Sequence, residues 1–592
     1  MSTLLKLRQR YKWTPKNLNV ISKRYQQTKT QIKRLPRYQP IDVVPVFRRA
    51  SNFTDKVALR DSFGHYTYGN LFMGAKELSN EVSQTLSEGN ILNQKVLYLC
   101  GNNANYILTQ WAIWMSGHIA VPLSPLHPQN LLEYYANDSN AKLIVTTTEY
   151  ADLIQRVSKN CKTKLLVLDD KLRQNASQMN PVKQSDMEGG LPPDFYNKSN
   201  AMILYTSGTT GNPKGVVLSH KNLVSQITCL IDAWKWSEKD TLLHTLPLHH
   251  VHGIVNALLC PHYIGAKCIM LPKFDANTVW AYLLGINTNP DDRRISVYMA
   301  VPTIYSRLIN EHQKVFSSDS KMVEYIRTTL KNKLRLMVSG SAPLPATIYE
   351  KWFEISGHKL LERYGMTEIG MCLSNEYDSD RTPGYVGIPL PGVSVRLVRK
   401  IDDGEDNYLS LLESTNVKGV VNTNTTNNMD SEGNPVGELQ VKGDNVFREY
   451  YNKPQATEQE FTIDGWFKTG DIAEYSLKDK KFKLLGRQSV DIIKSGGYKI
   501  SALSIETQIL EHPGIADCAV VGVKDDEWGQ KIVALVVLKP KVETFKIEEF
   551  NEWAKPRMAG YCIPKEVKIV TSIPKNAMGK VNKKELVQSL FA

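Results

Sequence analysis

The stretch that decides the fold is LYTSGTTGNPKG, residues 204–215. It overlaps a short apolar run, Met202–Tyr205, which predicts a strand. The next ten positions hold four hydroxyl residues, three glycines and one lysine. Glycines let a backbone approach a ligand closely, hydroxyls and amides donate to phosphate oxygens, and a lysine adds positive charge. The composition therefore predicts a loop that holds a polyphosphate.

The predicted phosphate loop is not the Walker pattern, because no Ser or Thr follows its lysine. A flexible Gly/Thr turn without a ligand is the alternative reading of the same residues. The candidate nucleotide-binding residues of the loop are Thr206, Ser207, Gly208, Thr209, Thr210, Gly211, Asn212, Pro213 and Lys214.

Apolar stretches alternate with amphipathic ones on both sides of this loop. Lys95–Cys100 and Ala141–Thr147 are expected to be buried strands, with a helix at Asn105–Ser116 between them. Such alternation is typical of α/β layers. Further strand candidates are Val297–Val301, Arg335–Val338 and Leu360–Leu361.

Two changes in composition divide the remainder of the 592 residues. Residues 401–436 are polar and rich in Asn and Thr, and we expect a surface loop there. After Gly486 the chain begins a segment with strands and helices of its own. This predicts a large N-terminal domain over residues 42–485 and a smaller C-terminal domain over residues 486–592. The C-terminal candidates are strands at Ala519–Val523 and Ile532–Leu538 and helices at Ile505–Glu511 and Ile547–Trp553.

The net charge of +13 comes from the N-terminus. Residues 1–41 hold eleven Lys and Arg and no acid, so 13 minus 11 leaves about +2 for the rest of the chain. A nucleic-acid interface across the fold is therefore not expected. A basic, acid-free segment of this kind resembles a mitochondrial transit peptide, which predicts the mitochondrial matrix as the location. The alternative is a disordered basic tail that is not a targeting signal.

Cysteine spacing and hydropathy exclude other classes. The eight cysteines are widely spread without a CxxC pair, which favours reduced, buried thiols over a zinc site or a disulfide framework. No apolar run approaches the ~18 residues of a membrane span, so we expect a protein that does not cross a bilayer.

Five blocks in order resemble the motifs of the adenylate-forming superfamily of acyl-CoA synthetases, luciferases and adenylation domains. The resemblance covers about residues 42–592 and implies that family's α/β fold, with layered sheets and helices in the large domain and a mobile α+β C-terminal domain. The five blocks are Thr206–Lys214 (TSGTTGNPK), Arg363–Glu368 (RYGMTE), Thr469–Asp471 (TGD), Gly486–Lys499 and Pro574–Lys580 (PKNAMGK).

The resemblance implies a role for each matching residue. Tyr364 would stack on adenine, Thr367 would meet the phosphate, and Glu368 would hold Mg²⁺, a hard ion that prefers carboxylate oxygens. Asp471 would bind the ribose hydroxyls, and Lys580 would be the catalytic lysine that meets negative charge at the α-phosphate. The remaining residues carried over are Arg487 at the nucleotide, a pivot within Gln488–Asp491, and Lys494, Ser495 and Gly496 near the pantetheine channel.

The implied activity is ATP-dependent ligation of a carboxylic acid to coenzyme A through an acyl-adenylate. ATP with Mg²⁺ and CoA are the expected cofactor and co-substrate, and fatty acid metabolism is the expected setting. The hinge block is one residue longer than in many relatives, so the pivot within 488–491 stays open. A non-catalytic binding protein on the same fold is the alternative of another class.

Three stretches resemble the malonyl-CoA synthetase branch, including its mitochondrial acyl-CoA synthetase family member three type. They are Leu246–Gly253, Met299–Arg307 and Ser339–Pro343. The resemblance implies that Arg307, one turn into a helix beginning near Pro302, contacts the second carboxylate of malonate or methylmalonate.

Burial of a free carboxylate requires a cation and hydrogen bonds, which Arg307 and the Ser341 hydroxyl could supply. His250 or His252 would assist thioester formation or pack beside the acyl group. Three alternatives stay open: Arg307 facing solvent, Arg307 pairing with Glu311, and a pocket for a medium-chain or aromatic acid.

Overall fold

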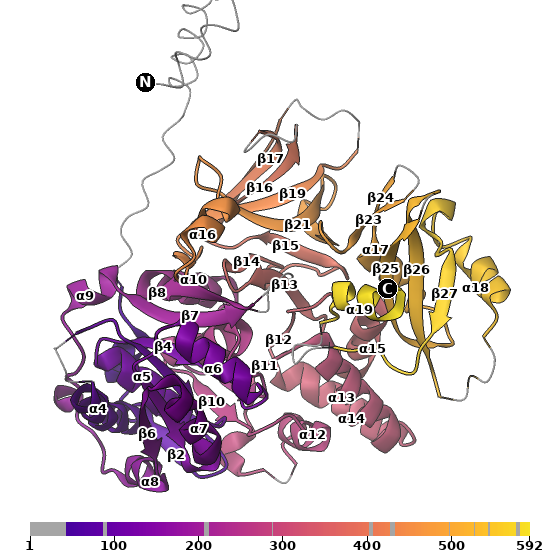
Figure 1. Ribbon diagram of the computed structural model, residues 1–592. Coiled ribbons are helices and arrows are strands. Elements are labelled where there is room, and N and C mark those ends of the chain that lie inside the picture. The colour runs from indigo at the N-terminus through magenta and orange to yellow at the C-terminus, as the bar shows by residue number, and fades with distance from the viewer. Residues whose placement is uncertain are drawn as a thin grey trace, which may run out of the picture. The chain divides into compact units, whose positions relative to one another are not determined.

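A computed structural model gives the architecture of the chain (Figure 1). The chain divides into two units, residues 1–42 and 43–592. The first unit, with the predicted transit peptide, lies outside the described residues. The structure describes residues 43–86, 91–206, 212–286, 288–401, 407–426, 433–495, 498–525, 527–540, 542, 545–575 and 580–591.

A seven-stranded sheet carries the glycine-rich loop, in the order β20-β8-β7-β4-β3-β5-β6. The run from β7 to β6 is parallel, whereas β8 and β20 are antiparallel additions. The strands are β3 Lys95–Leu99, β4 Ile119–Pro122, β5 Leu143–Thr147, β6 Lys164–Leu168, β7 Asn200–Thr206, β8 Lys214–Ser219 and β20 Glu449–Tyr450.

Helices cover both faces of this sheet, which is why β3 is apolar at successive positions. Val96 and Tyr98 belong to a core shared with α4 and α5. Leu97 and Leu99 belong to a second core shared with α6 and α7. The predicted strands near residues 95 and 141 and the helix between them are confirmed. The helices are α4 Tyr68–Thr85, α5 Ala104–Met115, α6 Gln129–Asp138, α7 Ala151–Cys161, α8 Asp170–Gln178 and α9 Pro193–Lys198.

A path of fifteen strands forms the second sheet system, in the order β18-β17-β16-β19-β21-β22-β15-β14-β13-β12-β11-β9-β10-β1-β2. The run from β13 to β1 is parallel, whereas the pairings from β13 to β18 and the pairing of β1 with β2 are antiparallel. The strands are β1 Val57–Arg60, β2 His65–Thr67, β9 Thr241–His244, β10 Lys267–Met270, β11 Val297–Ala300, β12 Leu336–Ser339, β13 Leu361–Met366, β14 Gly370–Ser374, β15 Tyr385–Pro389, β16 Val393–Lys400, β17 Tyr408–Val417, β18 Val420–Thr425, β19 Val436–Gly443, β21 Phe467–Ser476 and β22 Lys481–Arg487.

The parallel part of this path is also covered on both faces. Leu242 and Met299 face the core shared with α10 and η4, whereas Leu243 and Tyr298 face a core built with α12 to α15. The strand and helix predictions at residues 297, 302 and 335 are confirmed. The helices are α3 Val46–Arg49, α10 His220–Ala233, η4 His252–Leu259, α11 Cys260–Ile264, α12 Ala276–Leu284, α13 Pro302–Val315, α14 Ser320–Lys333, α15 Ala346–Ser356 and α16 Pro454–Glu460.

The prediction of a surface loop over residues 401–436 is wrong for residues 407–426, which form the hairpin of β17 and β18. Its two-residue turn has positive φ at Lys418 (51°) and Gly419 (87°), as a tight hairpin requires. Two inward-facing positions hold Ser414 and Asn416, which are buried but bonded to Thr423 and to the Pro389 carbonyl. Because these inward-facing positions hold polar residues, the sequence lacks the apolar–polar alternation that is typical of a half-buried strand.

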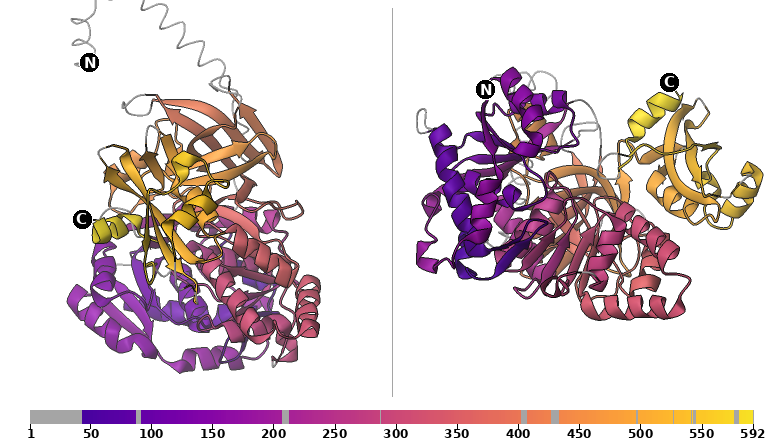
Figure 2. Two further views of the ribbon diagram at one scale, coloured as in Figure 1. Left: turned by 90° about the vertical axis from the view of Figure 1, so that its right-hand side faces the viewer. Right: turned by 90° about the horizontal axis from the view of Figure 1, so that it is seen from below.

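The C-terminal sheet has β24, β23, β26 and β25 in that order, with β27 alongside β26. Ile505 and Phe550 pack on one face of it, and Leu586 packs on the other. Figure 2 shows the helices flanking these strands from two further sides. The predicted C-terminal strands and helices are confirmed. The elements are β23 Ile492–Ser495, β24 Tyr498–Ser501, α17 Ala502–Ile509, β25 Ile515–Asp525, β26 Gly529–Leu538, α18 Ile547–Ala554, β27 Glu566–Ile569 and α19 Lys583–Phe591.

The change of sheet occurs in the stretch where we expect the hinge. Gly486 and Arg487 still belong to β22, while β23 starts the C-terminal sheet at Ile492. A turn connects them, in which the Asp491 amide donates to the Arg487 carbonyl at 2.7 Å.

The cysteines and the helices bear on two expectations from the sequence. All eight cysteines lie in the described part of the chain as free thiols, and six are buried. Among the described residues, no helix combines the length and apolar character that crossing a bilayer requires.

Candidate active site

The glycine-rich loop closes a hairpin. Thr206 at the end of β7 is paired with Lys214 at the start of β8. Ser207–Gly211 lie outside the described residues. The Pro213 carbonyl accepts a hydrogen bond from the Tyr134 hydroxyl at 2.8 Å, and Asn212 is exposed. The two strands therefore fix the base of the predicted phosphate loop.

Tyr450, which the sequence analysis missed, connects this loop to Glu368. The Lys214 ammonium lies 4.6 Å from the centroid of the Tyr450 ring and 3.5 Å from a Glu460 oxygen. The Tyr450 hydroxyl donates to Glu368 at 2.9 Å. Because β20 pairs with β8, Tyr450 is delivered to the loop by backbone register.

Thr367 and Glu368 occupy the turn between β13 and β14. Glu368 is buried, and its backbone carbonyl accepts from the Phe447 amide at 2.6 Å. Burial raises the pKa of the Glu368 carboxyl, despite the hydrogen bond from Tyr450. A carboxylate held in so confined a place gains from a bound cation, so it fits the predicted metal role.

Tyr364, Asp471 and Arg487 form one network. β21 and β22 pair Asp471 with Arg487, whose Nε donates to the carboxylate at 3.1 Å. The Tyr364 hydroxyl donates to the other oxygen of Asp471 at 2.5 Å. Burial alone would lower the pKa of Arg487, but attraction to Asp471 outweighs it and raises the pKa. Tyr364, Asp471 and Arg487, which different motifs predict at the nucleotide, therefore lie together. The Arg487 guanidinium and the Tyr364 hydroxyl orient the Asp471 carboxylate.

The charges of Arg487 and Asp471 also act on the pKa of Lys580. Its side chain keeps solvent contact, yet desolvation, followed by repulsion from Arg487, lowers the pKa of its ammonium. Attraction to Asp471 and Glu368 opposes this, and repulsion from Arg363 adds to it. The preceding residues 576–579 of the motif lie outside the described residues. The predicted catalytic lysine and the predicted nucleotide residues therefore influence one another's charge.

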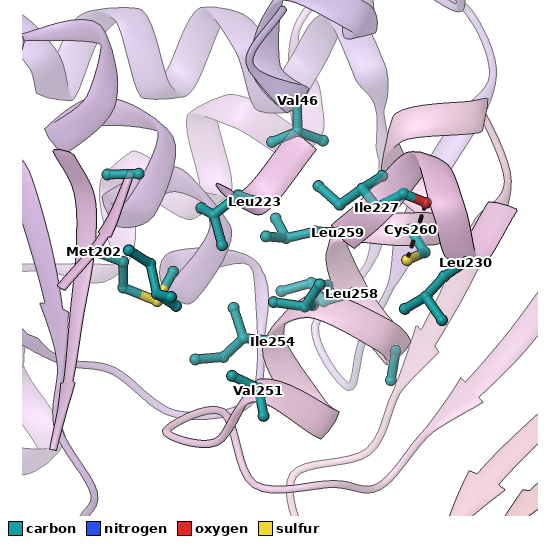
Figure 3. Packing of buried hydrophobic residues seen from close by; sticks show 14 of the residues in the cluster. Val46, Met202, Leu223, Ile227, Leu230, Val251, Ile254, Leu258, Leu259 and Cys260 are labelled. Atoms are coloured by element: carbon teal, nitrogen blue, oxygen red, sulfur yellow. Dashed lines mark hydrogen bonds between the residues drawn. The ribbon is translucent and has the colours of Figure 1, made fainter. Parts of the chain in front are cut away.

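The stretch Leu246–Gly253, predicted to line the acyl pocket, leads into a π-helix, η4. The amide of Cys260 bonds to the Val255 carbonyl five residues earlier. Such helices are rare and concentrate at functional sites. Figure 3 shows Ile254, Leu258 and Leu259 of η4 packing against Leu223 and Ile227 of α10, which fixes the helix in the core.

His252, the first residue of η4, contacts Ser341, which lies in another of the stretches predicted to line the acyl pocket. Its Nδ1 lies 3.2 Å from the Ser341 Oγ, and the residue is buried. His250 is half-buried, with its ring centroid 4.0 Å from that of His249. Burial lowers the pKa of both His250 and His252 well below that of a free imidazole, so both are neutral near pH 7. Two of the stretches predicted for the acyl pocket are thereby in contact.

The burial argument from the sequence places Arg307 in a closed pocket, but the structure does not show it there. Its side chain is exposed on α13, and no hydrogen bond or ion pair joins it to another described residue. A closed charge pair at Arg307 is therefore not formed, although a role in contacting substrate stays a prediction. The buried cation beside Ser341 is Arg363, whose Nη2 donates to the serine Oγ at 3.2 Å. The sequence analysis quoted Arg363 only as the first residue of the RYGMTE motif.

The chain belongs to the AMP-binding enzyme family. The family's main model matches residues 46–451, and the model of its C-terminal domain matches residues 504–580. The predicted fold class, a large domain of layered sheets and helices with a smaller C-terminal domain, is confirmed.

The chain is 45% identical to the mitochondrial malonate–CoA ligase ACSF3 of Xenopus laevis, over 93% of this chain and 92% of the relative. The human protein of that name is 43% identical, over 92% of each chain. Among solved structures, ATP-bound MatB from Rhodopseudomonas palustris matches with a TM-score of 0.76 and 29% identity, over 93% of this chain and 99% of that one.

Proposed function

We propose that this protein is an AMP-forming malonate–CoA ligase. The observation that carries the proposal is similarity over nearly the full length of both chains to proteins named for that activity. Malonate and ATP would give malonyl-AMP and pyrophosphate. Attack by the CoA thiol on the acyl carbon would then form the thioester and release AMP. Methylmalonate is a second proposed substrate.

The nucleotide site would divide its tasks among the residues described above. Loop residues 206–214 would hold the phosphates, Asp471 would accept hydrogen bonds from the ribose hydroxyls, and Tyr364 would lie against adenine. Lys580 would neutralise the negative charge that grows at the α-phosphate as the malonate oxygen attacks. No covalent protein nucleophile is needed, because the adenylate itself is the activated acyl group.

Magnesium fits this site with Glu368 as its protein ligand. Among the described residues, no group of three or more His, Cys, Asp or Glu side chains is arranged to hold a metal. Mg²⁺ is commonly held by one or two carboxylates plus phosphate oxygens and water, so a single buried carboxylate is sufficient. When bound, the ion would neutralise phosphate charge during attack.

Glu368→Gln should reduce adenylation at least ~100-fold, because it removes the anionic ligand while keeping the hydrogen bond to Tyr450. The measurement is malonate-dependent pyrophosphate release across a Mg²⁺ titration, in which the midpoint should move to higher Mg²⁺. Glu458→Gln, on the exposed surface of α16, is the matched control. An unchanged midpoint in Glu368→Gln would exclude the metal role.

The substrate assignment is tested by assaying malonate, methylmalonate, acetate and octanoate side by side with ATP and CoA. We expect AMP and thioester formation with malonate, and weaker or absent turnover of acetate and octanoate. Preference for octanoate would instead support the medium-chain alternative.

We further propose that residues 42–485 and 486–592 act as the two domains, and that residues 1–41 direct the protein to the mitochondrial matrix. The curated relatives above carry the word mitochondrial in their names. A fluorescent fusion of the full chain should enter mitochondria, whereas a fusion lacking residues 1–41 should stay outside. Equal distribution of the two fusions would contradict the targeting role.

A further inference from the structure

A short segment, residues 447–451, joins the phosphate loop to the RYGMTE motif through its backbone. The Phe447 amide donates to the Glu368 carbonyl at 2.6 Å, and the Tyr451 amide donates to the Gly215 carbonyl at 2.7 Å. The segment is thus bonded both to the proposed metal ligand and to the strand that follows the loop.

The side chain of Tyr450, in the middle of this segment, makes the same connection a second time. Its hydroxyl donates to Glu368 at 2.9 Å, and its ring centroid lies 4.6 Å from the Lys214 ammonium. The residue is only 4% exposed, and its ring meets that of Phe447 edge-on at a centroid distance of 4.8 Å. Because the ring is packed in the core, the hydroxyl and the aromatic face are held in fixed positions.

The Tyr450 hydroxyl remains a hydrogen-bond donor. Burial raises the pKa of Tyr450, and the negative charges of Glu368 and Glu460 raise it further, so the phenol keeps its proton at neutral pH. Carboxylates that bind metals are commonly oriented by hydrogen bonds from a second layer of residues. The bond from Tyr450 is of this kind, because it fixes one oxygen of Glu368.

The Tyr450 ring also bears on how two opposite charges are arranged. Lys214 forms its ion pair with Glu460 at 3.5 Å, and in the described structure none joins Lys214 to Glu368. A direct pair between Lys214 and Glu368 would neutralise the ammonium and occupy the carboxylate. An aromatic face instead attracts an ammonium while its full charge remains available to an anion.

We propose that Tyr450 is a positioning residue for both cations that the phosphates of ATP would meet. Its hydroxyl orients Glu368 toward Mg²⁺, and its ring holds Lys214 beside the phosphate loop. The inference rests on the proposed function and gives a role to a residue outside the five motif blocks. The two tasks can be separated, because phenylalanine keeps the ring and loses the hydroxyl, whereas leucine loses both.

The test is calorimetric titration of ATP into the full chain without malonate or CoA, once with excess Mg²⁺ and once with EDTA. Tyr450→Phe should weaken ATP binding with Mg²⁺ by ~5-fold or more, because the metal ligand is no longer oriented. With EDTA its affinity should stay within ~2-fold of wild type. Tyr450→Leu should weaken binding under both conditions, by ~3-fold or more with EDTA, because Lys214 also loses its support.

Malonate-dependent pyrophosphate release gives a second readout. The Mg²⁺ midpoint should rise in Tyr450→Phe, while kcat at saturating Mg²⁺ and ATP should stay within about 3-fold of wild type. Adding Tyr450→Phe to Glu368→Gln should not move the midpoint further, because Tyr450 acts through Glu368. Tyr451→Phe is the matched control, since Tyr451 is a half-buried neighbour whose ring lies 5.0 Å from the Lys95 ammonium.

Three results would overturn the proposal: equal weakening with Mg²⁺ and with EDTA in Tyr450→Phe, wild-type binding in Tyr450→Leu, or the same Mg²⁺-dependent loss in Tyr451→Phe. If thermal melting shows that Tyr450→Leu does not fold, the comparison of Mg²⁺ with EDTA in Tyr450→Phe decides. A wild-type protein that binds ATP but forms AMP with no carboxylic acid would instead refute the proposed function, and the binding comparison would still test Tyr450.

Discussion

Lys580→Ala should lower malonyl-adenylate formation by ~100-fold to 1,000-fold while leaving the reaction of supplied malonyl-AMP with CoA largely intact. The ammonium is the mobile point charge expected at the α-phosphate, where a preorganised donor contributes rate enhancements of this size. The thioester step makes its new bond at the acyl carbon and not at the α-phosphorus, so we expect it to depend less on this ammonium. The measurement is pyrophosphate release for the first half-reaction and malonyl-CoA formation from synthetic malonyl-AMP for the second.

Lys584→Ala, a neighbouring lysine on α19, is the control for loss of a lysine from this part of the chain. An equal loss in both half-reactions would reject the specific role of Lys580. Unchanged pyrophosphate release would reject any catalytic role for it.

The lowered pKa of Lys580 adds a pH signature to this prediction. Desolvation and the repulsion from Arg487 favour the neutral amine, so the proton is lost at a lower pH than from an ordinary lysine. Adenylation should therefore fall as the pH rises through this pKa. In Lys580→Arg the alkaline decline should move to higher pH, because guanidinium stays charged. An alkaline limb common to both proteins would assign the titration to another group.

Lys583→Met should destabilise the protein by about 3–5 kcal/mol, the cost of removing one partner from a buried ionic cluster. Lys583 is 8% exposed and joins Asp491, within the candidate hinge, to Glu506 of α17. Burial alone would lower the pKa of Lys583, but attraction to Glu506 and Asp491 outweighs it and raises the pKa. Methionine keeps most of the apolar stem, so the loss reports the missing charge. The loss in free energy of unfolding is measured by chemical denaturation of the full chain, with a probe that follows the C-terminal segment.

The raised pKa fixes the direction of the pH dependence. This stabilisation is fully present below the unfolded-state pKa of lysine and is lost as the pH rises through the higher folded-state pKa. Combining Lys583→Met with Glu506→Gln should cost less than the sum of the single changes, because the second change removes a carboxylate left without its cation. Strict additivity, or a loss below ~1 kcal/mol, would show that the cluster contributes little.

The catalytic motifs can be predicted because each places distinctive residue types within a few positions. Glu368, Asp471 and Arg487 can therefore be proposed as site residues from the sequence alone, and the structure shows Tyr364 bonded to the same carboxylate as Arg487. Tyr450 could not be predicted, since it reaches Glu368 only through the pairing of β20 with β8. A lone aromatic residue on a two-residue strand leaves no local pattern.

The exposure of Arg307 and the burial of Arg363 could not be predicted from sequence either. Spacing placed Arg307 correctly on the first turns of α13, but it did not tell which side of the helix meets solvent. Burial of Arg363 follows from its position on β13 together with the missing side chain at Gly340, which belongs to a different segment. The hairpin at residues 407–426 was missed because its inward positions hold hydrogen-bonded polar residues. In each case the deciding contact joins distant parts of the chain.

The most direct test of the central claim is malonate-dependent exchange of pyrophosphate into ATP by the purified protein in the absence of CoA. The roles proposed for residues 206–214, Glu368, Asp471 and Lys580 predict exchange that requires both malonate and Mg²⁺ and that is lost in Lys580→Ala. Absence of exchange with malonate, methylmalonate and every other short carboxylic acid, in protein that is folded and binds ATP, would contradict it.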